Sequence, residues 1–369
     1  MTEGNEVKLL VNGGAAYSSM LEAIEEAEDT INLETYIFAS DATGRRFAAA
    51  ISERAREGLE VNLLLDSLGS AGLDAEIEEQ LTRAGVRLAW YRPLAPWRQG
   101  WGWWRRDHKK ILVVDGRVGF VGGMNIGDDY ADPSAGGRGW RDTQARLRGP
   151  VVRQLQLAFM HTWRKAGGIE LLQQRHLRDL GPQGEAPAVI LTNGLRRQRR
   201  QIHRAYLHAL KRARDYIYIT NPYFAPDIGI RRRLRSAARR GVDVRILLAG
   251  ESSDVLLATL AARHTYARLL RCGVRIFEWL QPTIHAKTAV VDGAWATVGS
   301  CNLDMLSLRH NLESNVVVLG SHLACPLRDQ FLLDTDPEHA AEIRPDHWRY
   351  RPLGNRLLEW LAFGLRRFL

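Results

Sequence analysis

Cysteine is scarce in this chain of 369 residues, which contains only Cys272, Cys301 and Cys325. Their odd number and wide spacing argue against a disulfide framework or a cysteine metal site, and favour reduced thiols in a cytoplasmic protein. No run approaches the roughly 18–20 consecutive apolar residues that a membrane-spanning helix needs. Residues 1–7 are polar and acidic, so we expect no signal peptide.

Positive charge, by contrast, is in excess, with 51 Lys and Arg against 42 Asp and Glu and a formal net charge of +9. This balance favours an anionic partner, either nucleic acid or an acidic membrane surface, and does not choose between the two. The hydrophobic share of 45% and charged share of 25% are typical of a soluble globular protein. The length allows two domains of ordinary size.

One short motif occurs twice: a His, a Lys two residues later and an Asp five residues beyond the Lys. Each copy is followed by a glycine-rich turn that ends in Asn. The members are His108, Lys110, Asp115 and Asn125 in the first copy and, 177 residues later, His285, Lys287, Asp292 and Asn302 in the second. A single His-x-Lys pair is common and indicates little, whereas two copies with matching Asp and Asn indicate a site.

The residue types of this motif suit phosphoryl chemistry. Alternate residues of a strand point to the same face, so each His and its Lys are predicted to lie side by side on a strand. A neutral imidazole can attack an electrophile or move a proton near neutral pH, and the lysine charge suits phosphate oxygens that gain charge during displacement. The glycine-rich turns bring backbone and Asn donors close to an anion.

Predicted strands alternate with predicted helices, which indicates an α/β fold. Residues 29–41 and 215–227 align in register, so the second half repeats the first. We therefore predict two lobes that meet about a pseudo-twofold axis and bring both His-Lys pairs to one cleft. The predicted parts are a first lobe at 1–168, a Gly/Pro-containing linker at 169–187, a second lobe at 188–345 and an amphipathic tail at 346–369.

Two further segments fit either contact with a membrane or packing against the protein itself. Residues 92–107 interrupt the first copy before its His and interleave tryptophan with arginine, which fits a membrane-interface or substrate-gate loop, or a loop packed on its own lobe. Residues 356–369 gather leucines on one helical arc, with Glu359, Arg366 and Arg367 opposite. Such a helix lies in a membrane interface or docks on the second lobe. The tryptophans and arginines of the insertion are Trp97, Trp101, Trp103, Trp104, Arg98, Arg105 and Arg106.

The paired motif resembles the HxK(x)4D motifs of the phospholipase D superfamily, and the resemblance covers nearly the whole chain. The stretches at 32–38, 139–143 and 299–304 are most similar to bacterial cardiolipin synthases of the short form without N-terminal transmembrane helices. The resemblance implies two similar lobes, each a mixed β-sheet flanked by helices, packed as a pseudo-dimer within one chain.

The resemblance also implies roles for the site residues in a two-step displacement. His108 would attack phosphorus and form a phosphohistidine while His285 acts as acid and base, although the order of the two histidines stays open. An acidic residue downstream of each motif would hold the imidazole: Asp142 after the first and Glu313 after the second, with a surface carboxylate beside Arg141 as the alternative for Asp142. The catalytic-motif lysines Lys110 and Lys287, with the supporting residues Asn125 and Asn302, would bind phosphate oxygens. The motif aspartates Asp115 and Asp292 would accept hydrogen bonds from neighbouring turns.

The predicted function is that of a cardiolipin synthase-like phosphatidyltransferase, which moves a phosphatidyl group from one phosphatidylglycerol to another and releases glycerol. Phosphatidylethanolamine is an alternative donor. We expect no cofactor and no metal, because lysines and amides supply the positive field. The expected partner is phospholipid at an anionic membrane surface, without nucleic acid, on the cytoplasmic face of the bacterial inner membrane. The alternatives are a phospholipase D or nuclease-type hydrolase and a non-catalytic membrane scaffold.

Overall fold

The structure is a computed structural model that describes residues 1–93, 105–193, 200–250, 253 and 255–365. The four tryptophans of the insertion and Arg98 lie outside the described residues, as do Arg366 and Arg367 of the tail. Among the residues that the structure describes, no helix is both long enough and apolar enough to cross a bilayer.

The first lobe is an α/β unit in which strands and helices alternate before a run of antiparallel strands. Its elements are β1 (Thr2–Val11), α1 (Asn12–Glu25), β2 (Thr30–Thr35), α2 (Ala42–Arg56), β3 (Glu60–Asp66), α3 (Ala75–Arg83), β4 (Arg87–Tyr91), β5 (Ile111–Val114), β6 (Val118–Gly122), the 3-10 turn η1 (Pro133–Ala135), β7 (Thr143–Arg148) and α4 (Val151–Lys165).

The second lobe repeats this order and adds elements at its end. They are β8 (Ala186–Asn193), α6 (Gln201–Arg212), β9 (Tyr216–Thr220), α7 (Ile228–Arg239), β10 (Asp243–Leu248), α8 (Leu256–Leu270), β11 (Arg275–Trp279), β12 (Thr288–Val291), β13 (Trp295–Gly299), α9 (Met305–Arg309), β14 (Glu313–Leu319), α10 (Ser321–Asp334), β15 (Ala340–Glu342), α11 (Pro345–Arg349) and α12 (Leu353–Gly364).

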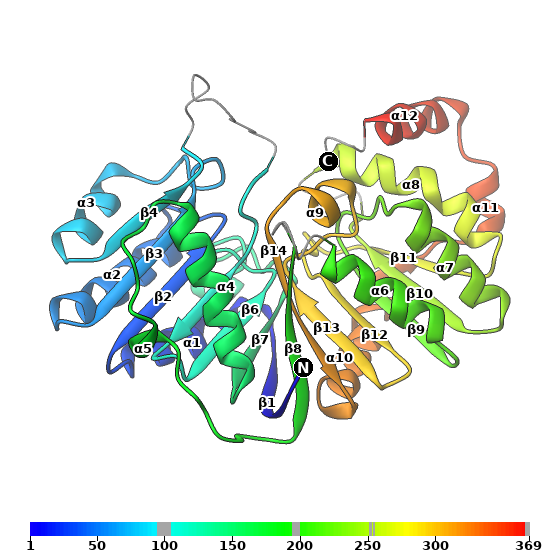
Figure 1. Ribbon diagram of the computed structural model, residues 1–369. Helices are drawn as coiled ribbons and strands as arrows, with labels where there is room; N and C mark the ends of the chain where they lie inside the picture. Colours follow the sequence, from blue (N-terminus) through cyan, green and yellow to red (C-terminus); the bar gives the residue numbers. More distant parts are fainter. Residues whose placement is uncertain (94–104, 194–199, 251–252, 254, 366–369) are drawn as a thin grey trace.

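The sheet topology confirms the predicted duplication. The strand order is β4-β3-β2-β5-β6-β7-β1 in the first lobe and, with the same connections, β11-β10-β9-β12-β13-β14-β8 in the second, with β15 at the outer edge. In each lobe three parallel strands adjoin antiparallel ones, so both halves are mixed sheets. The lobes join where β1 pairs with β8, and they lie on the left and right of Figure 1.

The core is layered in a way that explains why the two lobes adhere. Helices α1 to α3 cover the outer face of the first sheet, and α6 to α8 cover the outer face of the second. The inner faces share one apolar cluster, to which α4 contributes Leu155, α10 contributes Leu323 and both sheets contribute strand residues such as Val121 and Val298. Burial of this shared apolar surface stabilises the lobes against each other.

The Asp of each motif lies in a tight hairpin turn. Asp115 and Asp292 have φ of 53° and 52°, and each precedes a glycine with φ of 63°. Asp-Gly is the sequence favoured in two-residue hairpins where both central residues have positive φ. The Asp115 carboxylate accepts hydrogen bonds from the backbone N–H groups of residues 28 to 30 at 2.8–3.0 Å, and Asp292 does the same for residues 214 to 216. Both aspartates therefore tie a hairpin to the start of a neighbouring strand.

Residues 169–187, which we propose as the linker, are anchored on the first lobe. They contain the short helix α5 (Gln173–His176), whose fully buried His176 contacts Glu60 at 3.1 Å and Asn32 at 3.2 Å. Arg175 adds ion pairs to Asp29 and Glu60. The segment then crosses to the second lobe, where β8 begins at Ala186.

A buried ion pair also spans the two lobes. Arg141 of the first lobe donates from Nε and Nη2 to Asp334 of α10, at 3.0 and 2.7 Å, with both side chains at most 7% exposed. Removing one partner of a buried pair leaves the other charge uncompensated. We expect Asp334→Ala to lower the free energy of unfolding by about 3–5 kcal/mol in a urea titration.

The matched control for this prediction lies on the same helix. Asp329 pairs with Arg328 on the surface, where both side chains are at least 39% exposed. Asp329→Ala should therefore change the unfolding free energy by less than about 1 kcal/mol. Equal effects of the two substitutions would show that the Arg141–Asp334 pair does not stabilise the lobe interface.

Candidate active site

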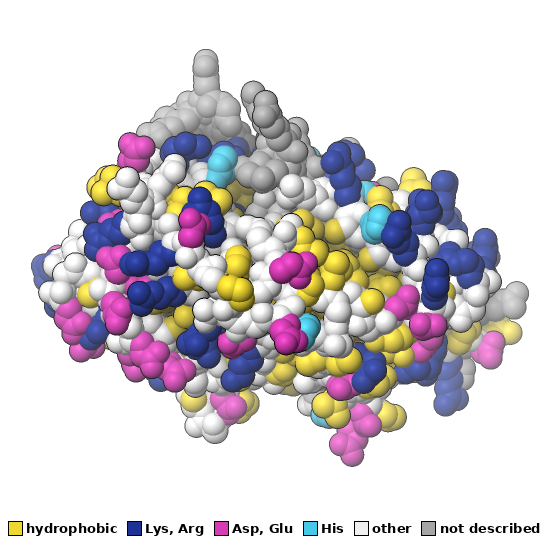
Figure 2. Space-filling view, turned by 60° about the horizontal axis from the view of Figure 1, so that its bottom comes forward, with side chains coloured by type: hydrophobic (Ala, Val, Ile, Leu, Met, Phe, Trp, Pro, Cys, Tyr) yellow, Lys and Arg dark blue, Asp and Glu magenta, His cyan; other side chains and the backbone are white. Residues whose placement is uncertain are grey.

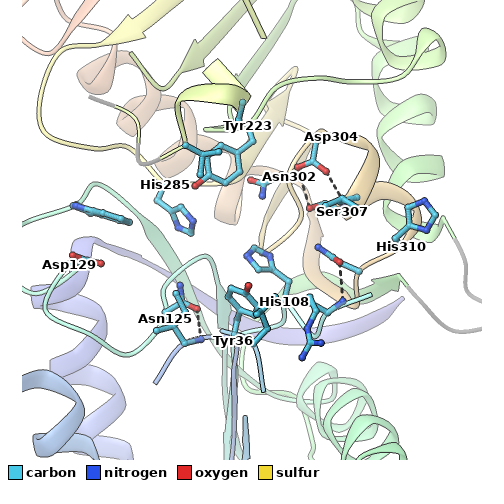
Figure 3. Close-up of a pocket in the computed structure, with 18 of the residues that line it drawn as sticks. Tyr36, His108, Asn125, Asp129, Tyr223, His285, Asn302, Asp304, Ser307 and His310 are labelled. Carbon is cyan, nitrogen blue, oxygen red and sulfur yellow. Dashed lines mark hydrogen bonds between the residues drawn. The ribbon is translucent and has the colours of Figure 1, made fainter. Parts of the chain in front are cut away.

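A cavity of about 710 Å³ lies between the lobes and is lined by residues of both. His108 and Asn125 come from the first lobe and His285 and Asn302 from the second, so the structure brings the two motif copies together. Figure 3 shows the two imidazoles on opposite sides of this cavity, pointing towards each other.

The alternating pattern predicted that each histidine lies on a strand, and this prediction is wrong. Strands β5 and β12 begin only at Ile111 and Thr288, three residues after each His. Instead, each His segment pairs with the other lobe: the N–H of His108 donates to the carbonyl of Leu312 at 2.9 Å, and the N–H of His285 donates to the carbonyl of Arg141 at 2.7 Å. The cross-lobe pairing draws both segments away from their own sheets and fixes them at the interface.

The same crossing reverses the expected carboxylate partners. Nδ1 of His108 contacts Glu313 at 3.2 Å, and Nδ1 of His285 contacts Asp142 at 2.8 Å. Each imidazole is thus held by the acidic residue of the opposite lobe. The prediction that each acid holds the histidine of the motif that precedes it is therefore wrong. Asp142 is fully buried, which excludes the surface-carboxylate alternative.

The two His–carboxylate pairs differ electrically. Burial opposes ionisation of Asp142, but the hydrogen bond to His285 and the charge of Lys287 outweigh it and hold its pKa below the ordinary value. Burial raises the pKa of Glu313 well above the ordinary value, against the opposing effects of Lys110 and a hydrogen bond from Ser300. The His285 pair therefore contains an ionised carboxylate, whereas the partner of His108 is a carboxyl group that resists ionisation.

A glycine explains how Asp142 approaches the first motif so closely. A Cβ on Gly123 would lie 2.4 Å from Oδ1 of Asp142. The equivalent position in the second copy is Ser300, whose hydroxyl donates to Glu313. The two copies therefore use the same turn differently: one leaves room for its carboxylate and the other hydrogen-bonds it.

The lysines lie behind the histidines, where they are almost completely buried. Nζ of Lys110 donates to the carbonyl of His108 at 2.8 Å, and Nζ of Lys287 donates to the carbonyl of His285. Burial lowers the pKa of Lys110 to about 7. Burial, together with the charges of Lys110 and Lys287, also holds the pKa of His108 well below its ordinary value, so this imidazole is neutral at neutral pH.

The two asparagines hold different positions in the cavity wall. The side-chain oxygen of Asn125 accepts a hydrogen bond from the Ile37 N–H at 3.1 Å, and its amide donates to the hydroxyl of Tyr130 at 2.9 Å. Asn302 is 3% exposed, and among the residues that the structure describes its side-chain oxygen has no hydrogen-bond partner. The side-chain oxygens of the two asparagines therefore differ, because that of Asn125 is engaged by the Ile37 N–H.

Aromatic rings that the sequence argument did not assign surround both histidines. The Tyr36 ring lies 5.1 Å from that of His108, edge to face, while Tyr130 and Tyr223 lie 5.6 and 6.2 Å from His285. Trp140 extends the wall beside Tyr130. Tyr36 and Trp140 fall within the stretches 32–38 and 139–143 that resemble the family. That resemblance was the one sign in the sequence that these two rings belong to the site.

Asp304 is a further cavity residue for which the sequence predicted no role. It caps α9 by accepting a hydrogen bond from the Ser307 N–H at 2.7 Å, lines the cavity, and is 3% exposed. Burial raises its pKa to about 7. Its counterpart in the first copy is Gly127, so the two sides of the cavity are chemically unlike.

Within the described part of the chain, no group of three or more His, Cys, Asp or Glu side chains is placed to hold a metal ion. The cavity instead gathers imidazoles, amides and aromatic rings, with two lysines behind them. This set can bind an anion of phosphate type and offer it a nucleophile and a proton carrier.

Duplicated α/β lobes that each bring a His-Lys motif to one cavity define a protein of the phospholipase D class. A family profile described as "Cardiolipin synthase, PLD-like domain" matches residues 20–134 and 206–334, one segment in each lobe. The chain belongs to this family.

Curated relatives agree with the profile. The chain is 37% identical over 331 residues to cardiolipin synthase B of Escherichia coli (strain K12), covering 89% of this chain and 79% of the relative. It is 35% identical over 358 residues to the cardiolipin synthase of Geobacillus kaustophilus, covering 96% and 70%. The crystal structure of phosphatidylserine synthase from Haemophilus influenzae has the same fold, with a TM-score of 0.76, 12% identity and coverage of 99% of this chain and 95% of that one.

Proposed function

We propose that this protein is a phosphatidyltransferase that makes cardiolipin from two molecules of phosphatidylglycerol through a phosphohistidine. The observation that carries the proposal is the meeting of two imidazoles at one cavity, each with Nδ1 on a carboxyl group of the opposite lobe. A proton held on Nδ1 leaves a lone pair on Nε2, which is the form needed for attack or for proton transfer.

In the first step, Nε2 of His108 attacks phosphorus of the donor lipid and the bond to the glycerol oxygen breaks. His285, protonated, delivers its proton to that oxygen, and glycerol leaves. In the second step, His285 takes the proton from the terminal hydroxyl of the acceptor phosphatidylglycerol, whose oxygen attacks phosphorus while the phosphorus–nitrogen bond to His108 breaks. The proton and both imidazoles return to their starting states, so the cycle balances.

The buried groups support the assignment of His108 as nucleophile. Its lowered pKa keeps the imidazole neutral, as attack requires, whereas the ionised Asp142 beside His285 favours the imidazolium that a proton carrier must form. Lys110, Lys287, Asn125 and Asn302 would stabilise the charge on the phosphate oxygens. A bound phosphodiester anion would favour the charged form of Lys110, whose pKa of about 7 makes that charge sensitive to its surroundings.

The test of this function is incubation with vesicles of labelled phosphatidylglycerol, followed by separation of the products. We expect cardiolipin and glycerol in equal amounts. Phosphatidic acid without cardiolipin would identify a hydrolase, and cleavage of DNA without any lipid product would identify a nuclease. Vesicles with labelled phosphatidylethanolamine would show whether the protein also uses this lipid as a phosphatidyl donor.

We further propose a peripheral position on the cytoplasmic face of the bacterial inner membrane, because the substrate lipids would reside in that membrane. The net charge of +9 supports contact with an anionic lipid surface.

A further inference from the structure

Helix α12 is oriented opposite to the usual pattern of a helix at a protein surface, which buries its apolar face. The side of α12 that faces the second lobe carries Glu359 and Ala362, which are only 2% exposed. Glu359 is neutralised by an ion pair with Arg351 at 2.6 Å. The leucines and the tryptophan of the helix lie on the outside: Leu357 is 58%, Leu358 53%, Trp360 60% and Leu361 49% exposed.

This arrangement resolves the two alternatives left by the sequence, because α12 docks on the second lobe and still exposes its apolar arc. At 100° per residue, the exposed leucines and the tryptophan between Leu353 and Leu365 cover roughly 160° of the helix circumference. The helix contacts the lobe through Ala362 and through Phe363, whose ring stacks on His264 at 4.4 Å. An exposed apolar arc of this breadth indicates a partner.

The half of the chain that carries α12 is basic, whereas the first half is slightly acidic. Residues 188–369 contain 28 Lys and Arg against 16 Asp and Glu, whereas residues 1–187 contain 23 against 26. Figure 2 shows acidic and basic side chains intermixed over the first lobe on the left, whereas basic ones predominate along the right-hand edge over the second. The asymmetry belongs to the surface, since the duplicated strands and helices do not require it.

Helix α7 brings this charge to α12. It carries five arginines and no acidic residue, and the guanidinium of Arg231 lies 5.3 Å over the ring of Phe363 in α12. A cavity of about 230 Å³ opens between α7 and α8, lined by three arginines together with apolar and hydroxyl groups. Its lining residues are Ile228, Arg231, Arg235, Thr265, Arg268 and Leu269. Guanidinium groups beside apolar carbon suit a phosphate group attached to a lipid.

Helix α8 connects α12 with the active-site cavity. Helix α12 packs along α8 in Figure 1, and the first residues of α8, Leu256 and Leu257, are 64% and 37% exposed. Their neighbours Val255 and Ala258 line the active-site cavity. A surface that covers α12 would therefore also reach the entrance through which a lipid must pass.

We propose that α12 and the arginines of α7 and α8 form a docking surface for an anionic phospholipid bilayer, so that the protein lies on the membrane through its second lobe. The leucines and Trp360 would enter the headgroup boundary while the arginines bind lipid phosphates. The proposal rests on the proposed function only in taking the lipid substrate as the reason for docking.

The test is co-sedimentation of the full chain with vesicles of phosphatidylcholine, with and without phosphatidylglycerol. Leu357→Asp/Leu361→Asp should weaken binding to the mixed vesicles about tenfold or more, because two apolar side chains no longer enter the interface. Arg235→Glu/Arg268→Glu should weaken it about tenfold and reduce its salt dependence. Leu172→Asp and Arg46→Glu, at exposed positions away from the second lobe, are the matched controls and should bind as the unmodified protein does.

The same variants are then assayed with phosphatidylglycerol dispersed in neutral detergent, where no bilayer is needed. We expect turnover within about twofold of the unmodified protein, which shows that the fold and the site are intact. Unchanged vesicle binding in both double variants would overturn the proposal, as would loss of turnover in detergent, or binding of DNA by the basic face with no binding to vesicles. If the protein docks through α12 yet forms no cardiolipin, the docking surface stands and the proposed function falls.

Discussion

Cardiolipin formation is expected to fall by at least about 10⁴-fold when either His108 or His285 is replaced by alanine, because the scheme requires both imidazoles in each half of the cycle. Both histidines line one cavity, each beside a tyrosine ring. The measurement is the rate of cardiolipin release from labelled phosphatidylglycerol. The unfolding midpoint of each variant should match the unmodified protein, so that lost activity reports lost chemistry.

The two variants should differ when the leaving group no longer needs a proton. A phosphatidyl ester of p-nitrophenol expels a stable phenolate, so His285→Ala should release a burst of nitrophenol while His108 becomes phosphorylated. His108→Ala has no nucleophile and should give no burst. The opposite result would exchange the roles of the histidines without harming the two-histidine scheme. A normal steady rate of cardiolipin formation in either variant would refute that scheme.

The duplicated fold was predictable because the signal was present twice in the sequence. Two motif copies at a constant offset of 177 residues, together with the match of 29–41 to 215–227, require equivalent lobes, and equivalent lobes most simply meet about a twofold axis. The strand order of the two halves confirms this. The hairpin positions of Asp115 and Asp292 follow from the same pattern, because Asp-Gly between two apolar runs favours a tight turn.

The pairing of acids with histidines was not predictable from the sequence. A twofold arrangement allows Asp142 to meet either His108 of its own lobe or His285 of the other, and both choices preserve the symmetry. The outcome depends on the backbone contacts of Leu312 and Arg141 across the interface, which no local pattern encodes. The orientation of α12 was inaccessible for a similar reason. A helical pattern shows which residues share a face, but it does not show which face meets the protein.

The electrical difference between the two carboxyl partners leads to the second large prediction. Asp142→Asn should reduce cardiolipin formation by about 10²–10⁴-fold, whereas Glu313→Gln should cost about tenfold or less. The Asn amide would donate to Nδ1 of His285 and move the proton to Nε2, which is the wrong tautomer for a base. Glu313 resists ionisation, so a neutral amide in its place is a smaller change.

A positioning role for Asp142 predicts more than a lower rate, because this carboxylate acts only through His285. The defect of Asp142→Asn should shrink strongly in the nitrophenol burst, since that step does not need His285 as an acid, and it should return in full when phosphatidylglycerol is the donor. A defect of equal size with both donors would mean that Asp142 maintains the shape of the cavity rather than the protonation of its imidazole. A larger loss in Glu313→Gln than in Asp142→Asn would show that His108, held by Glu313, is the acid and base. His285 would then be the nucleophile.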